Sequence, residues 1–263
     1  MIPSRDIIEW SDFVPWTSNE QVEQDLVISR SLVELFTDEI ILENLAFRGG
    51  TAIHKLFFFP QPRYSEEIDR VQIKPGPLGH IIDRIRENVS FIGEPRRNQK
   101  NRNNTLYYRF DSEGVPVQRL KLKVETNCRE HRSLFDLEQK HFEVKSSWFN
   151  GKCKIPTYQI EELLGTKLRA LYQRKKGRDL YDIHKVLSSE LGISIEKIIQ
   201  AYTFYMKDEP GGIPNPNTYI ENIELKLKDP EFLADTTILL HPSEEYNPEA
   251  AYNTLKDLLL SKL

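Results

Sequence analysis

Residues 45–56 read Leu-Ala-Phe-Arg-Gly-Gly-Thr-Ala-Ile-His-Lys-Leu. The apolar start predicts a short buried strand and the last five residues predict a helix, so the glycine pair lies in a strand-to-helix turn. Glycine at the start of a helix lets backbone N–H groups approach an anion closely, and the helix dipole favours the negative charge. The turn therefore predicts a phosphate site, although such turns are also common in proteins that bind no phosphate.

An acidic strand follows this turn. Residues 63–69 read Arg-Tyr-Ser-Glu-Glu-Ile-Asp and lead into a predicted strand, on which Glu67 and Asp69 point to the same face. Two carboxylates on one face are able to hold a hard cation, although two acids on a strand are more often a solvated edge. Glu125, near the end of the strand predicted over 120–126, offers a third carboxylate, with a solvent-facing strand end as the alternative.

Beyond the middle of the chain the pattern of apolar residues becomes helical. Within the helix predicted over 160–174, Lys167 and Arg174 are seven residues apart and project from one face. Asp179 and Asp182 follow in the next predicted helix. A positive face of this kind suits a triphosphate or an RNA backbone. The alternative is a solvated basic helix whose charges pair with the two aspartates.

A second basic segment is predicted to be an exposed turn over residues 95–104. Basic side chains beside aromatic rings suit contact with RNA, and a solvated loop is the alternative. The residues concerned are Arg96, Arg97, Lys100, Arg102, Tyr107 and Tyr108.

Composition limits the class of protein. The chain has 263 residues, 39% of them hydrophobic, which is enough for one large or two modest domains with a buried core. Its net charge of −4 means that a polyanion site must be a local patch. The sequence has no apolar run of about 18 residues and no secretory signal at its start, so we expect a cytoplasmic protein without a membrane partner.

Walker loops, nucleophile elbows and paired histidine ligands are absent from the sequence, which argues against P-loop and hydrolase classes.

The strand, glycine turn, helix and acidic strand, in this order, resemble the phosphate and metal site of the polymerase-beta-like nucleotidyltransferases. From about Glu23 to about Leu187 the chain also resembles the AbiEii/AbiGii toxin family, whose members are also called MenT-like nucleotidyltransferases. The longest and most specific part of the resemblance runs from Leu164 to Asp182. The matching segments are 23–25, 47–52, 63–69, 121–127, 164–167 and 178–182.

The resemblance implies an α+β fold. A mixed nucleotidyltransferase sheet with helices would occupy residues 1–155, and a mainly helical domain over 156–263 would complete the active site. The residues implied to bind the nucleotide are Gly49, Gly50, Thr51, Ser65, Lys167 and Arg174. Those implied to bind the metal are Glu67, Asp69 and Glu125. Those implied to be catalytic are Lys167, Asp179 and Asp182.

The function that the resemblance implies is transfer of a nucleotide from an NTP to an RNA acceptor, with Mg²⁺ or Mn²⁺ as cofactor. The expected acceptor is the 3′ end of tRNA, which would block translation. Family members are toxins of toxin–antitoxin or phage-defence pairs, so a cognate antitoxin is an expected partner. Two alternatives stay open: a protein or small-molecule acceptor, and a catalytically weakened module that binds nucleotide or RNA.

Two residues depart from the family pattern. Glu67 stands where the family usually has aspartate, and Arg70 stands where an apolar residue is expected. Glutamate is one methylene longer, and Mg²⁺ demands tight octahedral geometry, so the change is able to reduce activity sharply. Natural divergence, a weakened enzyme and deliberate attenuation are all compatible with these two residues.

Overall fold

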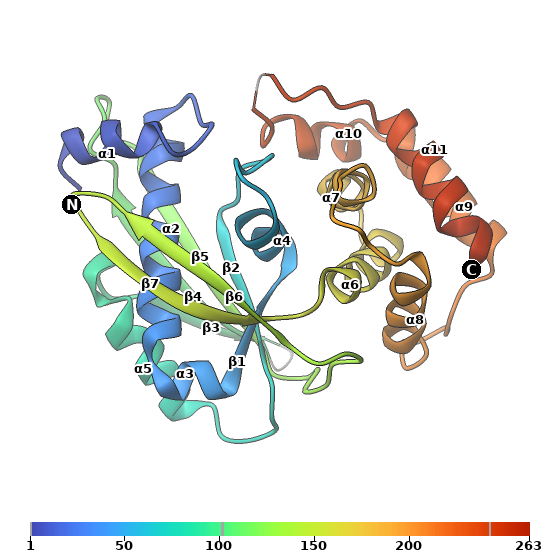
Figure 1. Cartoon of the computed structure of the whole chain (residues 1–263), viewed down its shortest axis with the longest axis horizontal. Coiled ribbons are helices and arrows are strands. Elements are labelled where there is room, and N and C mark those ends of the chain that lie inside the picture. Colours follow the sequence, from blue (N-terminus) through green and yellow to red (C-terminus); the bar gives the residue numbers. More distant parts are fainter. Residues whose placement is uncertain (1, 101–102, 242) are drawn as a thin grey trace. The chain divides into compact units, whose positions relative to one another are not determined.

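The chain forms two compact units in the computed structural model (Figure 1). The residues that the structure describes are 2–100, 103–241 and 243–263. Unit 1 comprises Met1–Ser133 and Leu137–Thr157, and unit 2 comprises Leu134–Asp136 and Tyr158–Leu263. Among the described residues, no helix has both the length and the apolar character that a membrane span requires.

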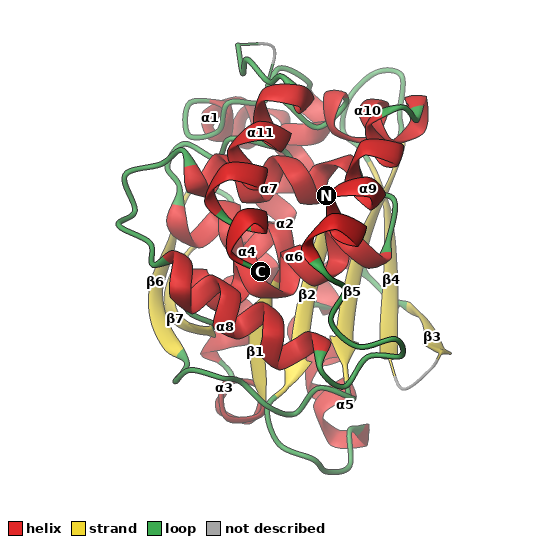
Figure 2. Cartoon of the chain, turned by 90° about the vertical axis from the view of Figure 1, so that its right-hand side faces the viewer, coloured by secondary structure: helices red, strands yellow, loops and turns green. Residues whose placement is uncertain are grey.

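Unit 1 is built on a seven-stranded mixed sheet with the order β3-β4-β5-β2-β1-β7-β6 (Figure 2, yellow). Parallel pairing joins β1 to β7 and β2 to β5, and the other neighbours are antiparallel. The mixed sheet and helices confirm the fold class predicted from the sequence. The strands are β1 Leu45–Arg48, β2 Glu67–Gln72, β3 Arg96–Lys100, β4 Asn103–Asp111, β5 Arg119–Asn127, β6 Glu138–Lys145 and β7 Asn150–Thr157.

The long helix α2 organises the core of unit 1. It packs against β2, β5, β6 and β7, and its side chains Leu26, Val27 and Ile28 are fully buried. Ser18 precedes the helix, but its hydroxyl contacts the Glu20 side chain and does not cap a backbone N–H. The helices of unit 1 are α1 Ser4–Ser11, α2 Asn19–Thr37, α3 Glu39–Asn44, α4 Gly49–Phe57, α5 Gly79–Asn88 and the short 3₁₀ helix η1 Ser90–Ile92.

Within the basic segment predicted as a turn over residues 95–104, residues 96–100 and 103–104 instead belong to two paired strands, so that prediction is wrong. Strand β3 pairs antiparallel with β4, and Arg97 lies opposite Leu106. The described side chains of β3 from Arg96 to Gln99 are exposed, so this edge strand has no buried face and no apolar alternation to reveal it. A charged edge of this kind resists edge-to-edge pairing with other chains. Arg102 lies outside the described residues.

Unit 2 is helical. Asparagine or aspartate side chains cap three of its helices, and each of these helices begins with proline, an arrangement that favours a helix start. Gly165 permits a close crossing of α6 and α8, because a Cβ there would lie 2.5 Å from the Cβ of Ala201. The helices are α6 Ile160–Gln173, α7 Gly177–Leu187, α8 Ile195–Met206, α9 Pro216–Leu227, α10 Pro230–Thr237, α11 Pro248–Leu258 and the 3₁₀ helix η2 Leu260–Lys262.

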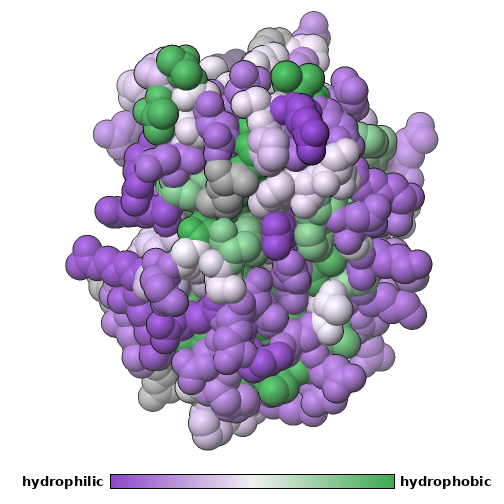
Figure 3. Space-filling view, turned by 90° about the vertical axis from the view of Figure 1, so that its left-hand side faces the viewer, coloured by the Kyte–Doolittle hydropathy of each residue, from purple (hydrophilic) through white to green (hydrophobic). Residues whose placement is uncertain are grey.

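The surface shown in Figure 3 is mostly hydrophilic, and its hydrophobic side chains lie in small separate groups. Exposed apolar residues such as Ile8 and Val115 occur in different parts of unit 1. Scattered exposed apolar side chains are normal on folded proteins.

Arg70 lies on the opposite face of β2 from Glu67 and Asp69, and it is only 1% exposed. Its Nη2 donates to the hydroxyl of Thr126 over 3.0 Å, but its Nε and Nη1 have no hydrogen-bond partner among the described residues. Burial lowers the pKa of Arg70 to about 10. A buried cation without a carboxylate partner is costly, and an apolar residue would avoid this cost.

We therefore expect Arg70→Met to raise the free energy of unfolding by about 1–3 kcal/mol, because it removes buried donors that lack acceptors. Urea unfolding at neutral pH measures this change. Arg96→Met, in the exposed edge strand β3, is the matched control and should leave the midpoint unchanged. A lower midpoint for Arg70→Met would contradict the expectation.

Candidate active site

The glycine turn is fixed by two constraints at Gly49. Its φ of +81° lies in the left-handed region, which residues that carry a side chain rarely adopt. A Cβ at this position would also lie 2.8 Å from Oδ2 of Asp69. The backbone at the start of α4 therefore lies directly against the Asp69 carboxylate, and only glycine permits this approach.

The residues that follow connect the turn to β2. The hydroxyl of Thr51 donates to the backbone carbonyl oxygen of Glu67 over 2.7 Å. Ser65 is buried, and its hydroxyl accepts from Nη1 of Arg63 over 3.2 Å. Gly50 is buried within the first turn of α4. Of the four residues of unit 1 predicted to bind phosphate, Gly49 and Thr51 therefore lie against β2, Gly50 lies between them in the chain, and Ser65 precedes β2 by two residues.

Three carboxylates lie on one face of the sheet. The parallel pairing of β2 with β5 places Glu67 opposite Lys123 and Asp69 opposite Glu125. The pKa of Asp69 is raised to about 6, first by burial and then by the nearby carboxylates of Glu67 and Glu125, while the cations Lys123 and Arg48 lower it. The site therefore carries more negative charge than its own cations neutralise.

Lys123 is the site residue that sequence reasoning missed. Its Nζ lies 2.8 Å from Oε2 of Glu67 and 3.0 Å from Oε2 of Glu125. Asn103 supports the same group, because its Nδ2 donates to Oε1 of Glu125 over 3.2 Å. The alternation of Lys121, Lys123 and Glu125 against apolar neighbours was the available signal, since it puts these side chains on one face.

The donor set has the chemistry of a site for a hard divalent cation, because it offers several carboxylate oxygens and an excess of negative charge. Within the part of the chain that the structure describes, however, no three His, Cys, Asp or Glu side chains are arranged to hold a metal ion. The Lys123 ammonium lies between two of the three carboxylates. The residues Glu67, Asp69 and Glu125 therefore suit Mg²⁺ or Mn²⁺ by their chemistry, and their side chains must rearrange to bind it.

Unit 2 holds a second charged cluster. Nζ of Lys167, on α6, lies 2.8 Å from Oδ1 of Asp179 and 2.7 Å from Oδ2 of Asp182, both on α7. The guanidinium of Arg174 reaches both oxygens of Asp179, over 2.7 and 2.9 Å. Burial opposes ionisation of Asp179, yet Lys167 and Arg174 hold its pKa below the usual value. The structure thus brings together the four residues of unit 2 that the sequence singled out.

Other basic residues of this segment are paired within unit 2. Arg178 and Lys176 contact the carboxylate of Asp235, and Lys175 contacts Asp229. These contacts match the structural alternative for the basic stretch, in which the charges form ion pairs. Lys167 differs from them because its side chain is 7% exposed and the side chains of both its acidic partners are fully buried.

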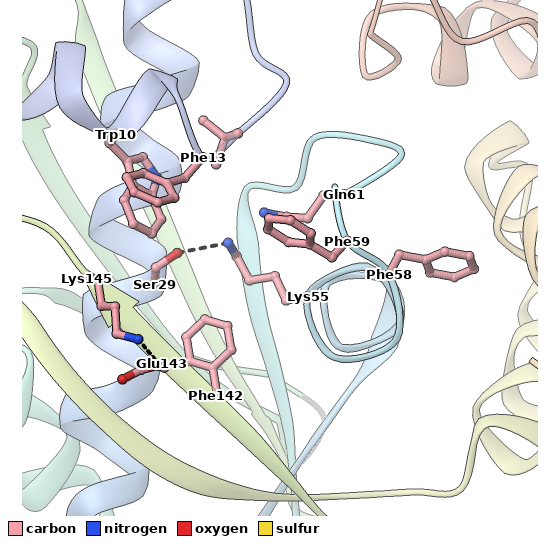
Figure 4. Close-up of a pocket in the computed structure, with 11 residues that line it drawn as sticks. Trp10, Phe13, Ser29, Lys55, Phe58, Phe59, Gln61, Phe142, Glu143 and Lys145 are labelled. Atoms are coloured by element: carbon pink, nitrogen blue, oxygen red, sulfur yellow. Dashed lines mark hydrogen bonds and ion pairs between the residues drawn. The ribbon is translucent and has the colours of Figure 1, made fainter.

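A buried polar network anchors α4. The carboxylate of Asp25 accepts from Nε1 of Trp10, Nζ of Lys55 and Nε2 of Gln61, over 3.1, 2.9 and 3.1 Å. Figure 4 shows Lys55 pointing toward Ser29, to whose hydroxyl it also donates. A cavity of about 180 Å³ adjoins this network. Its aromatic lining consists of Trp10, Phe13, Phe58, Phe59 and Phe142.

Two solved structures are similar in fold to this chain. MenT4, a nucleotidyltransferase toxin from Mycobacterium tuberculosis H37Rv, is 16% identical with a TM-score of 0.62, over 99% of this chain and 88% of MenT4. JHP933 from Helicobacter pylori is 16% identical with a TM-score of 0.54, over 92% of this chain and 90% of JHP933. This chain therefore shares its fold with both proteins.

The sequence model of the family described as "Nucleotidyl transferase AbiEii toxin, Type IV TA system" matches residues 30–256. This chain therefore belongs to the AbiEii nucleotidyltransferase toxin family, as the motifs predicted. Among curated proteins, none shows a significant match to the sequence.

We expect Gly49→Ala to lower the free energy of unfolding by about 1–3 kcal/mol, because it combines a strained φ with a clash against Asp69. Urea denaturation measures the loss. Gly79→Ala is the matched control: a Cβ there meets open space, and the glycine also stands at a helix start. Equal midpoints for the two variants would show that the close approach at Gly49 is not required.

The raised pKa of Asp69 predicts a pH-dependent stability. With a pKa of about 6 when folded and about 3.9 when unfolded, Asp69 binds more protons in the folded state between these values. The free energy of unfolding of the wild type, relative to Asp69→Asn, should therefore fall as pH rises from about 4 to above about 6. Urea unfolding of both proteins in EDTA measures this difference, and a constant difference would contradict the prediction.

Proposed function

We propose that this protein transfers a nucleotide from an NTP to an RNA acceptor, with the 3′ end of tRNA as the first candidate, and so blocks translation. The observation that carries the proposal is the gathering of three carboxylates beside the glycine turn at the start of α4. Nucleotidyl transfer requires both a phosphate site and acidic side chains for divalent metal. Membership of the AbiEii family supports the reaction class and makes an antitoxin the expected partner.

The start of α4 supports the phosphate site. This helix has nine residues, and its first backbone N–H groups follow a glycine that permits close approach. Such N–H groups and the helix dipole stabilise an anion. In the proposal Gly49, Gly50 and Thr51 bind phosphate oxygens, with Ser65 assisting from the segment before β2.

The three carboxylates would hold Mg²⁺ or Mn²⁺. A bound divalent cation would supply charge neutralisation on the phosphates and on the departing pyrophosphate. The Asp69 carboxylate lies close to Gly49, and Glu125 accepts a hydrogen bond from the side-chain amide of Asn103. Glu67 has a longer side chain than the aspartate usual in the family, and we propose that this length lowers the activity.

In unit 2, Lys167 and Arg174 supply the positive charge that the proposal assigns to triphosphate neutralisation. Asp179 and Asp182 orient the Lys167 ammonium through the two ion pairs described above. Because both aspartates are fully buried, removal of the lysine charge would take one cation from Asp179, which keeps Arg174, and would remove the Lys167 ion pair of Asp182. A test at Lys167 therefore needs a variant that keeps the positive charge, such as Lys167→Arg.

One observation favours a second candidate function, a nucleotide- or RNA-binding module without turnover. The carboxylates are not arranged for a metal, and Glu67 is ion-paired to Lys123. Glu67→Asp separates the two candidates. If this variant and the wild type both bind NTP and both fail to label any acceptor, the binding module is the better account.

The direct test incubates the protein with total tRNA, Mg²⁺ and each of four labelled NTPs in turn. We expect label on tRNA with one preferred NTP. Asp69→Asn and Glu125→Gln should lower labelling by about a hundredfold or more, because each removes a charged metal ligand.

Asp111→Asn is the matched control, because this exposed aspartate pairs only with Arg119 among the contacts of the described residues. It should label tRNA as the wild type does. Label that resists RNase would indicate that the acceptor is a protein and not an RNA. Full labelling by Asp69→Asn would contradict the proposed site.

A further inference from the structure

We infer that Lys123 is a built-in counter-ion that closes the carboxylate site, so that a divalent cation must displace its ammonium group before it can bind. The inference rests on the proposed function, which identifies Glu67, Asp69 and Glu125 as a metal site. It goes beyond that function by assigning a positioning role to a cation of this chain and by predicting weak metal binding without nucleotide.

The geometry of Lys123 carries the inference. Its Nζ bridges Oε2 of Glu67 and Oε2 of Glu125, over 2.8 and 3.0 Å. The Lys123 side chain is 24% exposed, so it is partly buried but not in the core of the unit. The bridge joins adjacent strands, since Lys123 lies opposite Glu67 in the register of β2 and β5. One ammonium thus contacts two of the three proposed ligands.

This bridge and a metal ion exclude each other. Mg²⁺ binds carboxylate oxygen at about 2.0–2.1 Å and demands near-octahedral geometry. An ammonium held by two of the ligands occupies the space between them and fixes the orientation of their oxygens. The absence of a metal-binding arrangement among the described residues agrees with this exclusion.

The charge balance explains why a divalent cation is able to displace the Lys123 ammonium from the carboxylates. Lys123 contributes one positive charge to a group of three carboxylates. A cation with two charges neutralises the group more completely, and the flexible four-carbon stem of lysine permits its ammonium to move away. Displacement therefore requires no change in the backbone of β2 or β5.

The length of Glu67 contributes to the bridge. Its carboxylate extends one methylene further from the strand than that of an aspartate, and it reaches Nζ of Lys123 in the neighbouring strand. A shorter side chain at this position would lengthen or break this contact. Glu67→Asp should therefore weaken the ion pair with Lys123, while a carboxylate is still present at position 67.

The test measures Mn²⁺ binding without nucleotide, by the paramagnetic resonance signal of free Mn²⁺, for the wild type and Lys123→Met. Methionine is an unbranched side chain that is one atom shorter than lysine and carries no charge. We expect the Kd for Mn²⁺ to fall by about tenfold or more, because the competing ammonium is gone.

Lys121→Met is the matched control. Lys121 lies two residues earlier on the same face of β5, and its Nζ sits 4.6 Å from the centre of the Tyr107 ring. Its removal should leave the Kd unchanged. Glu67→Asp provides a second measurement if Lys123→Met does not fold, and it should also bind Mn²⁺ more tightly than the wild type.

The outcomes separate this inference from the proposed function. An equal or higher Kd in Lys123→Met, with Mn²⁺ binding that Asp69→Asn abolishes, would overturn the inference and leave the metal site intact. Failure of every variant to bind Mn²⁺, with and without NTP, would overturn both. A lower Kd in Lys123→Met that a further Asp69→Asn change abolishes would support both.

Discussion

The parallel pairing of β2 with β5 is the constraint on which the candidate site depends. It places Asp69 opposite Glu125 and Glu67 opposite Lys123, so that side chains from distant parts of the sequence share one face. Burial of Asp69, together with the like charges of Glu67 and Glu125, raises the pKa of its carboxyl group. The Lys123 ammonium relieves part of this repulsion in the protein without ligands.

The rest of unit 1 holds this face in position. Asp25 accepts hydrogen bonds from Trp10, Lys55 and Gln61, and so ties α1 and α4 to α2. Because α4 is fixed at Lys55 and its first residue lies against Asp69, the network links the packing of α2 to the position of the glycine turn. Repulsion at the site is thus opposed by hydrogen bonds and packing elsewhere in unit 1, a common arrangement at functional sites.

Local patterns predicted much of this structure. The glycine turn and the alternation of β2 are encoded by adjacent residues, and the α+β class with its nucleotidyltransferase motifs was predicted correctly. Edge strand β3 was mistaken for a turn, because its exposed polar residues lack an apolar face. Lys123 was missed because its partner Glu67 is 56 residues away and the contact depends on strand register. Periodicity in one sequence contains no information about which strands are neighbours.

The most direct test of the account is a crystal structure with Mn²⁺ and a non-hydrolysable NTP analogue. The account predicts an anomalous scattering peak for manganese at the carboxylates of Asp69 and Glu125, with the Lys123 ammonium moved away from Glu67. Phosphates of the analogue should lie at the start of α4. Nucleotide bound elsewhere, with Lys123 still bridging Glu67 and Glu125 and no peak between the carboxylates, would contradict it.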